Sequence, residues 1–269
     1  MLGEIIFQNR RRRPLIHCIT NHVTANDCAN ILLACGGSAI MADDPDEVAE
    51  VTAMCDGLVL NMGTPSPRKI EALIRAGKEA NRLGHPVILD PVGVGSSLMR
   101  REAGRRLLAQ VHFAAIRGNA TEIATLVHGT AAHRGVDADI EESSMDAVDE
   151  NAKRLPQKTG AVIVVTGDTD IVTDGKTLYR VHNGHPMMKT VTGSGCQLSS
   201  LLGAYVTANP KKPLQAALAA VCAMGLSGEI AHARLSPLDG NASYRNYIID
   251  AIYNLTPDVL EKGAKYEID

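Results

Sequence analysis

Residues 58–90, LVLNMGTPSPRKIEALIRAGKEANRLGHPVILD, contain the pattern that decides the fold. Two short apolar runs, 58–61 and 87–90, are typical of strands that are buried on both faces of a parallel sheet. Between them an amphipathic segment begins at Ser66, continues with a proline at the first helical position and stops at Gly84. The stretch therefore predicts a strand, a helix and a second strand parallel to the first.

The same alternation extends in both directions along the chain. Further short apolar runs, which we expect to be strands, cover residues 38–41, 113–116 and 162–165. Residues 170–182 alternate around Asp174-Gly175, which predicts an edge hairpin with a type I′ turn. The order of elements predicts an α/β fold with a central, mostly parallel sheet, helices on both faces and right-handed crossovers.

Two other segments have distinct compositions. Residues 129–145 are rich in Gly, Asp, Glu and Ser and predict an exposed acidic excursion. Residues 214–226 form the longest apolar stretch, which is too short for a membrane span and predicts a buried helix. The chain shows no linker, internal repeat or secretory leader pattern, so we expect a single domain over residues 1–269.

The composition narrows the class of protein. Of the 269 residues, 45% are hydrophobic and 21% are charged, which is typical of a soluble globular protein. The net charge of −3 and an aromatic content of 3% without Trp argue against nucleic acid as a partner. The six cysteines include no CxxC pair, which predicts reduced thiols in a cytoplasmic protein. The pair His182 and His185 reads as surface loop and not as a zinc site.

Polar or glycine-rich turns follow the predicted strands. They begin at Met41, Asn61, Asp90, Arg117, Thr166 and Thr192. In folds of this class ligands bind beyond the carboxyl ends of the strands, and these ends meet at one edge of the sheet. The turns therefore predict a long binding rim along that edge.

Two standard nucleotide-binding motifs are present only in part. The triplet GKT at 175–177 resembles the end of a P-loop, but Asp170 replaces the required first glycine and the triplet lies in the predicted hairpin. The stretch GVG at 93–95 begins like a dinucleotide fingerprint and lacks its third glycine. An NAD-dependent oxidoreductase is therefore only a weak alternative.

The turn Gly193-Ser194-Gly195-Cys196 precedes a run that predicts a buried helix. Glycines there leave backbone N–H groups free at the positive end of the helix, which suits a phosphate whose charge develops during transfer. A tight helix start without a ligand fits the spacing equally well. Cys196 falls in the first helical turn, where a thiol can have a lowered pKa and take a proton or attack. The alternative for Cys196 is a small buried apolar residue.

Two acidic residues are candidate ligands of a hard divalent cation. Asp90 ends a strand, and its carboxylate either holds Mg²⁺ through water or caps the next turn. Glu122 follows Asn119 at the spacing of a capping box, so it either serves a metal or caps a helix. The spacing leaves both alternatives open.

Taken together, these motifs resemble the hydroxyethylthiazole kinase family of the ribokinase-like superfamily. The resemblance covers about residues 14–230. Its motifs, in order along the chain, are PLIHCITN (14–21), ANILLA (29–34), IMA (40–42), LDPVGVG (89–95), IRGNATEI (116–123), VTG (165–167) and VTGSGC (191–196). Several long motifs in the same order are more specific than any one of them.

The resemblance implies that ATP, with Mg²⁺, phosphorylates the hydroxyl of 4-methyl-5-(2-hydroxyethyl)thiazole in thiamine salvage. It also implies a homotrimer with active sites between subunits. The implied roles are thiazole binding by Met41, Gly193 and Asn21, ATP binding by Arg117, Thr166 and Asn119, metal binding by Asp90 and Glu122, and a catalytic anion hole formed by Gly193, Ser194, Gly195 and Cys196. Related kinases often have Asp where this chain has Cys196, so we expect the thiol to assist catalysis without dominating it.

The chain departs from the family pattern in two places. Residues 37–39 are Gly-Ser-Ala where the family often has Ala-Ser-Pro, and Gln197 stands where an apolar residue is common. Ala39 puts the fine substrate preference in doubt. Two further functions remain as alternatives: an ATP- or ADP-dependent dehydratase of a hydrated nicotinamide nucleotide on the same fold, and a non-catalytic nucleotide sensor. The product distinguishes the three functions: a kinase yields a phosphorylated alcohol, a dehydratase yields inorganic phosphate, and a sensor shows no turnover.

Overall fold

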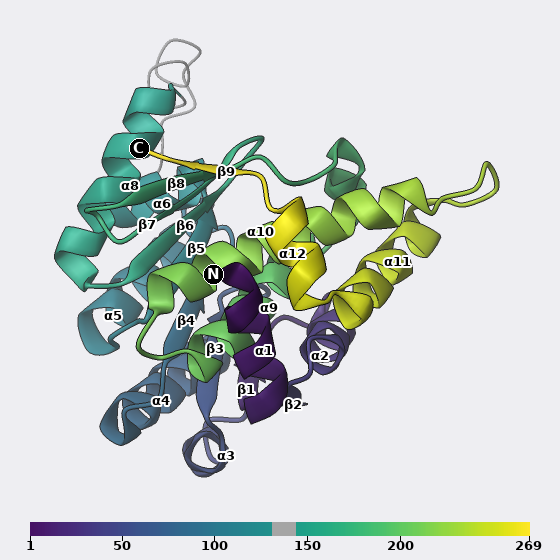
Figure 1. Ribbon diagram of the computed structural model, residues 1–269. Helices are drawn as coiled ribbons and strands as arrows, with labels where there is room; N and C mark the ends of the chain where they lie inside the picture. Colours follow the sequence, from purple (N-terminus) through teal and green to yellow (C-terminus); the bar gives the residue numbers. More distant parts are fainter. Residues whose placement is uncertain (131–143) are drawn as a thin grey trace.

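A single mixed sheet runs through the part of the chain that the computed structural model describes, residues 1–130 and 144–269 (Figure 1). The strand order is β2-β1-β3-β4-β5-β6-β7-β8-β9. The strands are β1 (Leu15–Ile19), β2 (Ser38–Ile40), β3 (Gly57–Asn61), β4 (Val87–Asp90), β5 (Ala115–Asn119), β6 (Val162–Thr166), β7 (Asp170–Thr173), β8 (Leu178–Val181) and β9 (Tyr266–Ile268). Strands β1 to β6 pair in parallel, whereas β7, β8 and β9 add antiparallel pairs at one edge.

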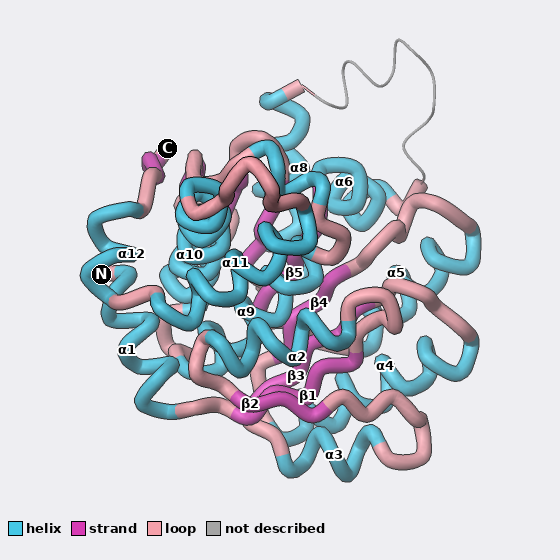
Figure 2. Tube along the Cα trace, turned by 90° about the vertical axis from the view of Figure 1, so that its right-hand side faces the viewer, coloured by secondary structure: helices cyan, strands magenta, loops and turns pink. Residues whose placement is uncertain are grey.

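Helices cover both faces of the sheet (Figure 2). One layer consists of α1 (Leu2–Arg12), α2 (Ala25–Ala34), α9 (Ser194–Ala208), α10 (Pro213–Ala233), α11 (Asn241–Asn254) and α12 (Pro257–Gly263). The other layer consists of α3 (Val48–Met54), α4 (Pro67–Leu83), α5 (Leu98–Gln110), α6 (Ala120–His128) and α8 (Met145–Thr159). A short 3-10 helix, η1 (Pro186–Thr190), leads toward α9. This arrangement confirms the predicted α/β architecture.

The sheet divides the core into two apolar clusters because successive side chains of a strand point to opposite faces. Within β3, Val59 packs into the cluster under α9 and α10, while Leu58 and Leu60 pack into the cluster under α4. Strands with a cluster on each side must be apolar throughout, which explains the continuous runs in the sequence. Polar side chains are consequently concentrated at the strand ends.

Helix α4 confirms the prediction made from its local sequence. Ser66 is the N-cap and its hydroxyl accepts a hydrogen bond from the backbone N–H of Lys69 at 3.1 Å. Gly84 ends the helix with φ of 72°, in the left-handed region that favours glycine. The expected strand at 113–116 is displaced, since β5 covers 115–119. Phe113 packs into a core cluster from the connection before the strand, and polar residues continue the strand to its end.

The edge hairpin is confirmed, but its predicted type I′ turn is wrong. Four residues, 174–177, connect β7 to β8, and among them only Gly175 has positive φ. A type I′ turn needs positive φ at both central residues. Instead, Asp174 accepts hydrogen bonds from the backbone N–H groups of Lys176 and Thr177, each at 2.9 Å. The GKT triplet therefore lies in a hairpin turn, as expected.

Helix α10 contains the apolar stretch that was expected to be a buried helix, and the prediction is confirmed. It is the one helix of the described chain that is long and apolar enough to cross a membrane, yet 83% of its most apolar 18-residue segment is buried inside the protein. The acidic excursion expected over 129–145 falls mostly on residues 131–143, outside the described residues. All six cysteines are buried free thiols.

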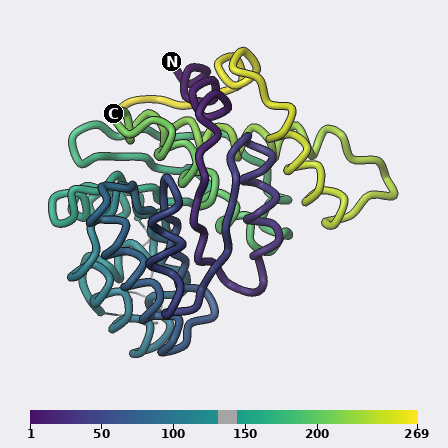
Figure 3. The backbone as a smooth tube through the Cα atoms, turned by 90° about the horizontal axis from the view of Figure 1, so that it is seen from below, coloured from purple at the N-terminus to yellow at the C-terminus, as the bar shows by residue number. Residues whose placement is uncertain are grey.

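The two ends of the chain lie on the same side of the molecule as seen in Figure 3. Helix α1 packs against α12, and the Met1 ammonium group pairs with Glu261 at 2.7 Å. The chain then ends in β9, which pairs with β8 at the sheet edge. The opposite region, where the parallel strands end, is free of both termini and carries the polar rim.

Candidate active site

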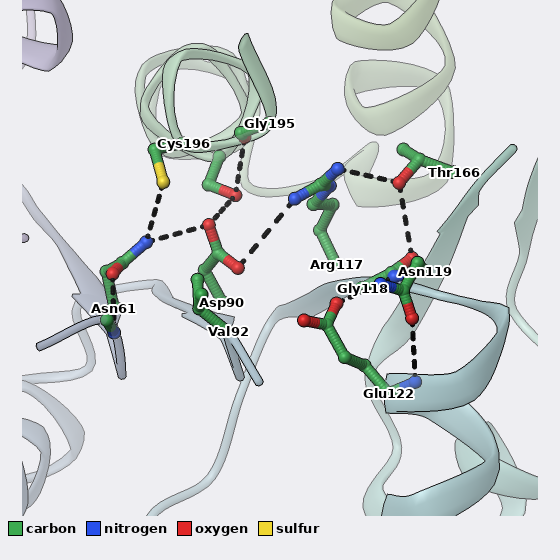
Figure 4. Close-up of polar contacts among 12 residues, drawn as sticks. Asn61, Asp90, Val92, Arg117, Gly118, Asn119, Glu122, Thr166, Gly195 and Cys196 are labelled. Atoms are coloured by element: carbon green, nitrogen blue, oxygen red, sulfur yellow. Dashed lines mark hydrogen bonds and ion pairs between the residues drawn. The ribbon is translucent and has the colours of Figure 1, made fainter. Parts of the chain in front are cut away.

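The carboxyl ends of neighbouring parallel strands bring the predicted rim residues together. Asn61 and Asp90 are register partners at the ends of β3 and β4. Arg117 and Asn119 lie on the last part of β5, and Asn119 pairs in register with Thr166 of β6. The first turn of α9 lies over these ends (Figure 4). Distant segments of sequence therefore meet because parallel strands end at one edge.

Asp90 is the most deeply buried carboxylate of the site, with no exposed surface. Its Oδ2 accepts hydrogen bonds from Asn61 Nδ2 and from the Ser199 hydroxyl, both at 2.8 Å. Its Oδ1 has no hydrogen-bond partner and lies 3.8 Å from Arg117 Nη1. Burial raises the pKa of Asp90 to about 6, although the Arg117 charge acts in the opposite direction. The carboxylate is thus held in an unfavourable ionised state, with one oxygen free.

Arg117 connects the Asp90 carboxylate to the end of β6. Its Nη2 donates a hydrogen bond to Thr166 Oγ1 at 2.6 Å, and its Nε is buried without a partner. Gly195 of α9 lies directly against the guanidinium, since a Cβ at position 195 would overlap both terminal nitrogens. A planar cation packed on a helix N-terminus is suited to bind the oxygens of a phosphate group.

Glu122 and Asn119 form the capping box that was one of the two interpretations. The Asn119 side chain accepts from Glu122 N, and Glu122 Oε2 accepts from Asn119 N, both at 2.8 Å. Glu122 Oε1 also accepts from Gly93 N at 2.7 Å, so the carboxylate holds the turn that follows β4. Capping is therefore confirmed, and each Glu122 oxygen retains a lone pair for a further contact.

The N-terminus of α9 has no such cap. Gly193 is the N-cap residue with φ of 86°, and within residues 1–130 and 144–269 no side chain accepts a hydrogen bond from the first turn. A Cβ at Gly193 would overlap the Thr24 side chain, so the turn is packed closely against the segment before α2. Free backbone N–H groups at a helix N-terminus are a favourable anion site.

Cys196 lies in the first turn of α9, as expected, and of its two interpretations the structure supports the small buried residue and not the thiol of lowered pKa. The side chain is 8% exposed, and burial together with the Asp90 charge raises the thiol pKa to about 11. Its Sγ accepts hydrogen bonds from Asn61 Nδ2 at 3.3 Å and from Asn21 Nδ2 at 3.4 Å. Burial and a neighbouring carboxylate thus outweigh the helix N-terminus, and the thiol keeps its proton at neutral pH.

Asn21 and Met41 lie on the side of the rim away from Arg117. Asn21 follows β1, and its amide reaches Asn61 Oδ1 at 3.1 Å as well as the sulfur of Cys196. Met41 follows β2 and packs at the margin of the core cluster under α9. The next residue, Ala42, offers its carbonyl to the buried His17 ring at 2.9 Å, which anchors the turn. Val23, close to Asn21 in the chain, is 64% exposed.

A cavity of about 640 Å³ opens on the Arg117 side of the rim. Arg117, Thr166, Ser194 and Gly195 line it, together with apolar side chains from α9, α10 and η1, which are Leu198, Val221, Met224, Pro186 and Met188. The cavity therefore combines charged and polar groups, which include Asp168 and Asp170 as well as Arg117, with apolar side chains, as ligand pockets generally do. His185 lies in the wall and stacks on His232, with ring centroids 3.5 Å apart, while His182 contacts Glu267 at 3.2 Å.

The two carboxylates fit a magnesium ion better than a metal held by protein alone. Among the described residues, no three His, Cys, Asp or Glu side chains converge as a ligand set. Mg²⁺ keeps several waters and is usually bound by one or two carboxylates plus substrate phosphates. The unpartnered Oδ1 of Asp90 supplies one such oxygen, and Glu122 lies close enough for its charge to raise the Asp90 pKa.

Several residues of the site have no sequence motif. Asn61 began one of the predicted turns, but nothing in the sequence assigned it a contact. Ser199 is three residues after Cys196 and so lies on the same helix face, a spacing that was available from sequence. The buried Lys69 of α4 donates from Nζ to the carbonyls of Thr20 and Gly63, both at 2.7 Å, and burial lowers its pKa to about 8.

Comparisons with known proteins agree on one family. The model of the hydroxyethylthiazole kinase family matches residues 6–258. A hydroxyethylthiazole kinase of Clostridium acetobutylicum is 53% identical and covers 99% of each chain. The solved hydroxyethylthiazole kinase of Pyrococcus horikoshii OT3 superposes with a TM-score of 0.88, at 30% identity, over 100% of this chain and 98% of that one. A ribokinase-like superfamily protein of Enterococcus faecalis V583, at 13% identity, shares the fold with a TM-score of 0.63 over 97% of this chain and 95% of that one.

Proposed function

This chain belongs to the hydroxyethylthiazole kinase family, and on that premise we propose how its residues transfer the terminal phosphoryl group of ATP to the hydroxyl of 4-methyl-5-(2-hydroxyethyl)thiazole. The reaction is the thiazole phosphorylation of thiamine salvage. The observation that carries the proposal is the uncapped N-terminus of α9, which meets Arg117 and Asp90 at one point of the rim.

The donor nucleotide is assigned to the cavity beside Arg117. Arg117, Thr166 and the amide of Asn119 would contact ATP, with the base toward the apolar wall. Phosphoryl transfer passes through a loose transition state whose charge spreads over the phosphoryl oxygens, so catalysis consists mainly of positioning and charge neutralisation. The guanidinium and the backbone N–H groups of residues 193–196 are fixed in advance, and therefore stabilise that charge without reorganisation.

Asp90 and Glu122 would hold Mg²⁺, partly through water, because Asp90 Oδ1 accepts no hydrogen bond and the Glu122 oxygens keep lone pairs beside their capping bonds. When bound, the ion neutralises phosphate charge and orients the leaving group. Asp90 is mostly ionised at neutral pH, because its pKa of about 6 lies below the pH of the solution. The Ser199 hydroxyl and the Asn61 amide hold that carboxylate at the strand end.

Cys196 would orient the hydroxyl of the acceptor. Its thiol is protonated at neutral pH, because burial raises its pKa to about 11, so it is a poor general base. A loose transition state requires little activation of the nucleophile, and the alcohol proton passes late to an oxygen of the transferred phosphoryl group. The thiol therefore contributes modestly, mainly by fixing the direction of attack.

The thiazole would bind on the Met41 and Asn21 side of the rim. A cytoplasmic homotrimer that completes this side from a neighbouring subunit is part of the proposal. Support comes from Val23, an apolar side chain that is 64% exposed two residues after Asn21. Burial of such a residue against a neighbour would exclude water from the acceptor. Light scattering on the purified protein measures the expected mass of three chains, and a monomer with full activity would contradict this part.

The activity is tested by ADP formation with Mg-ATP and either the thiazole alcohol or a hydroxymethylpyrimidine. We expect ADP release that depends on the thiazole alcohol, with one phosphorylated alcohol formed per ADP. Release of inorganic phosphate in its place would indicate a dehydratase or a simple ATPase. Binding of ATP without any ADP formation would indicate a sensor.

A further inference from the structure

The Asn61 side chain uses its whole hydrogen-bonding capacity inside the protein and has no group left to bind a ligand. The carboxamide has two donor hydrogens and two acceptor lone pairs. Nδ2 donates to Asp90 Oδ2 at 2.8 Å and to Cys196 Sγ at 3.3 Å. Oδ1 accepts from Gly63 N at 2.8 Å and from Asn21 Nδ2 at 3.1 Å. All four positions of a side chain that is 1% exposed are therefore used within the protein.

The contacts of Asn61 join parts of the chain that the reaction needs in fixed relative positions (Figure 4). Asp90 ends β4, while Cys196 begins α9 on the other side of the strand ends. The Asn61 amide lies between the carboxylate and the sulfur and donates to both. With the Asn21 amide it supplies two N–H donors to Sγ, so the thiol hydrogen must point elsewhere.

The surroundings hold Asn61 in this one orientation. Gly63 approaches so closely that a Cβ there would lie 2.8 Å from Asn61 Oδ1 and from the Asn21 side chain. Lys69 Nζ holds the carbonyls of Thr20 and Gly63, the residues that flank the two amides. A buried, fully satisfied polar network of this kind fixes geometry, since each broken bond leaves an unpaired group.

We propose that Asn61 is a positioning residue of the kinase reaction, which fixes the Cys196 sulfur and the Asp90 carboxylate relative to one another. The inference rests on the proposed function. Asn61 does not touch the reacting atoms in this assignment; it acts through the two side chains that do. The asparagine shape is required because Asp lacks the donors, Leu lacks all four bonds, and Gln is longer by one methylene.

A double-mutant cycle tests the coupling to the sulfur. We expect Asn61→Leu to lower kcat about 30-fold and Cys196→Ala about fivefold, with the KM for ATP changing less than about threefold. If Asn61 acts through the sulfur, the double variant is about as slow as Asn61→Leu alone. A loss equal to the product of the single losses, about 150-fold, would overturn the coupling.

A second variant keeps the test valid if the leucine variant does not fold. Asn61→Asp retains an acceptor toward Gly63 N and Asn21, but it replaces the donating Nδ2 by an oxygen, so both donations are lost and repulsion with Asp90 is added. We expect the same loss of kcat and the same cycle with Cys196→Ala. Activity of Asn61→Asp within about twofold of wild type would contradict the proposal.

The matched control is Asn9, another buried asparagine beside a cysteine. Asn9 Nδ2 donates to the Cys35 carbonyl at 2.8 Å and lies 3.7 Å from Cys35 Sγ, remote from the rim. Asn9→Leu should lower the melting temperature and leave kcat of the folded protein unchanged. A comparable drop in kcat would show that loss of any buried amide has this effect.

A readout that needs no turnover separates this inference from the proposed function. The alkylation rate of Cys196 by iodoacetamide at pH 8.5 is followed by peptide mass spectrometry. Loss of an N–H donor to Sγ disfavours the thiolate, so Asn61→Leu should slow alkylation of Cys196 several-fold. An unchanged or faster rate overturns the inference, whatever the acceptor alcohol is. Absence of thiazole phosphorylation by the wild type overturns only the proposed function.

Discussion

Helices α6 and α9 both begin at the carboxyl edge of the sheet, yet their first turns are used in opposite ways. Asn119 and Glu122 satisfy the N-terminus of α6 with the protein's own side chains. Gly193 leaves the N-terminus of α9 without a side-chain cap, in a left-handed conformation. A capped helix start contributes stability, whereas an uncapped one leaves backbone N–H groups that are able to bind an anion. The same position in the fold therefore serves structure in α6 and, in the proposed function, chemistry in α9.

The largest effect is expected at Asp90, which lies between the two helix starts. Asp90→Asn should lower kcat about a thousandfold, because it removes the charge that would hold Mg²⁺ while both helix starts remain intact. Steady-state kinetics with Mg-ATP measure this loss. A loss of tenfold or less would mean that the uncapped N-terminus of α9 supports the reaction largely without the Asp90 carboxylate.

The same variant should gain stability at neutral pH. The folded pKa of Asp90, about 6, is raised above its unfolded value, so the folded state binds the proton more tightly. Its ionisation therefore costs stability as pH rises from about 4 to 7, on the order of 3 kcal/mol from the size of the shift. Urea unfolding of the metal-free protein should show that the free energy of unfolding of Asp90→Asn lacks this loss between pH 4 and pH 7. An equal slope with pH in both proteins would contradict the assignment.

Gly193→Ala breaks the uncapped turn itself. The positive φ disfavours alanine and the added Cβ would overlap Thr24, so the turn must move. We expect kcat to fall about a hundredfold, the scale for loss of a preorganised N–H donor. Gly84→Ala is the control, since Gly84 has similar φ with no atom near its missing Cβ. Gly84→Ala should lower stability without changing kcat. A loss of kcat equal to that of Gly193→Ala would show that the N-terminus of α9 has no particular role in the reaction.

Glu122→Gln tests whether the capped turn is only structural. If Glu122 also serves Mg²⁺, as proposed, kcat/KM for Mg-ATP should fall about tenfold and the half-saturating Mg²⁺ concentration should rise. The loss of stability should be about 1 kcal/mol, as for a cap residue. Thr256→Ala, which removes the cap of the remote helix α12, is the matched control for stability. Unchanged Mg²⁺ dependence would leave Glu122 with its capping role only.

The smallest effect is expected at Cys196. Cys196→Ala should lower kcat about fivefold and leave ATP binding intact, because a protonated thiol contributes far less than the hundredfold or more of a general base. Isothermal calorimetry with ATP and steady-state kinetics measure the two parts. Cys35→Ala, at a fully buried thiol far from the rim, should change neither quantity. Unchanged turnover in Cys196→Ala would remove the thiol from the mechanism.

Local sequence was sufficient for the elements whose signals lie within a few residues. Ser66 and Gly84 mark the two ends of α4 because capping and left-handed backbone depend on adjacent residues only. The rim was predictable as well, since it needs only polar residues after apolar runs. The displaced start of β5 and the four-residue hairpin turn were not, because Phe113 and Asp174 are set by packing and side-chain hydrogen bonds.

The network around Asn61 shows where local signals end. Its partners Asp90 and Cys196 are 29 and 135 positions away, and a neutral amide belongs to no motif. The thiol pKa of Cys196 likewise depends on burial and on Asp90, so its position on the helix could not decide between a reactive thiol and a small buried residue. Properties that depend on several distant segments require the folded arrangement.

Arg117 and Gly195 are in such close contact that a larger residue at 195 requires a change in the Arg117 side chain. An alanine at 195 would displace the guanidinium, unless the arginine had first been exchanged for a shorter cation. Homologous sequences should therefore covary at these two positions. A library that randomises both codons together should yield active combinations that single-site libraries never contain.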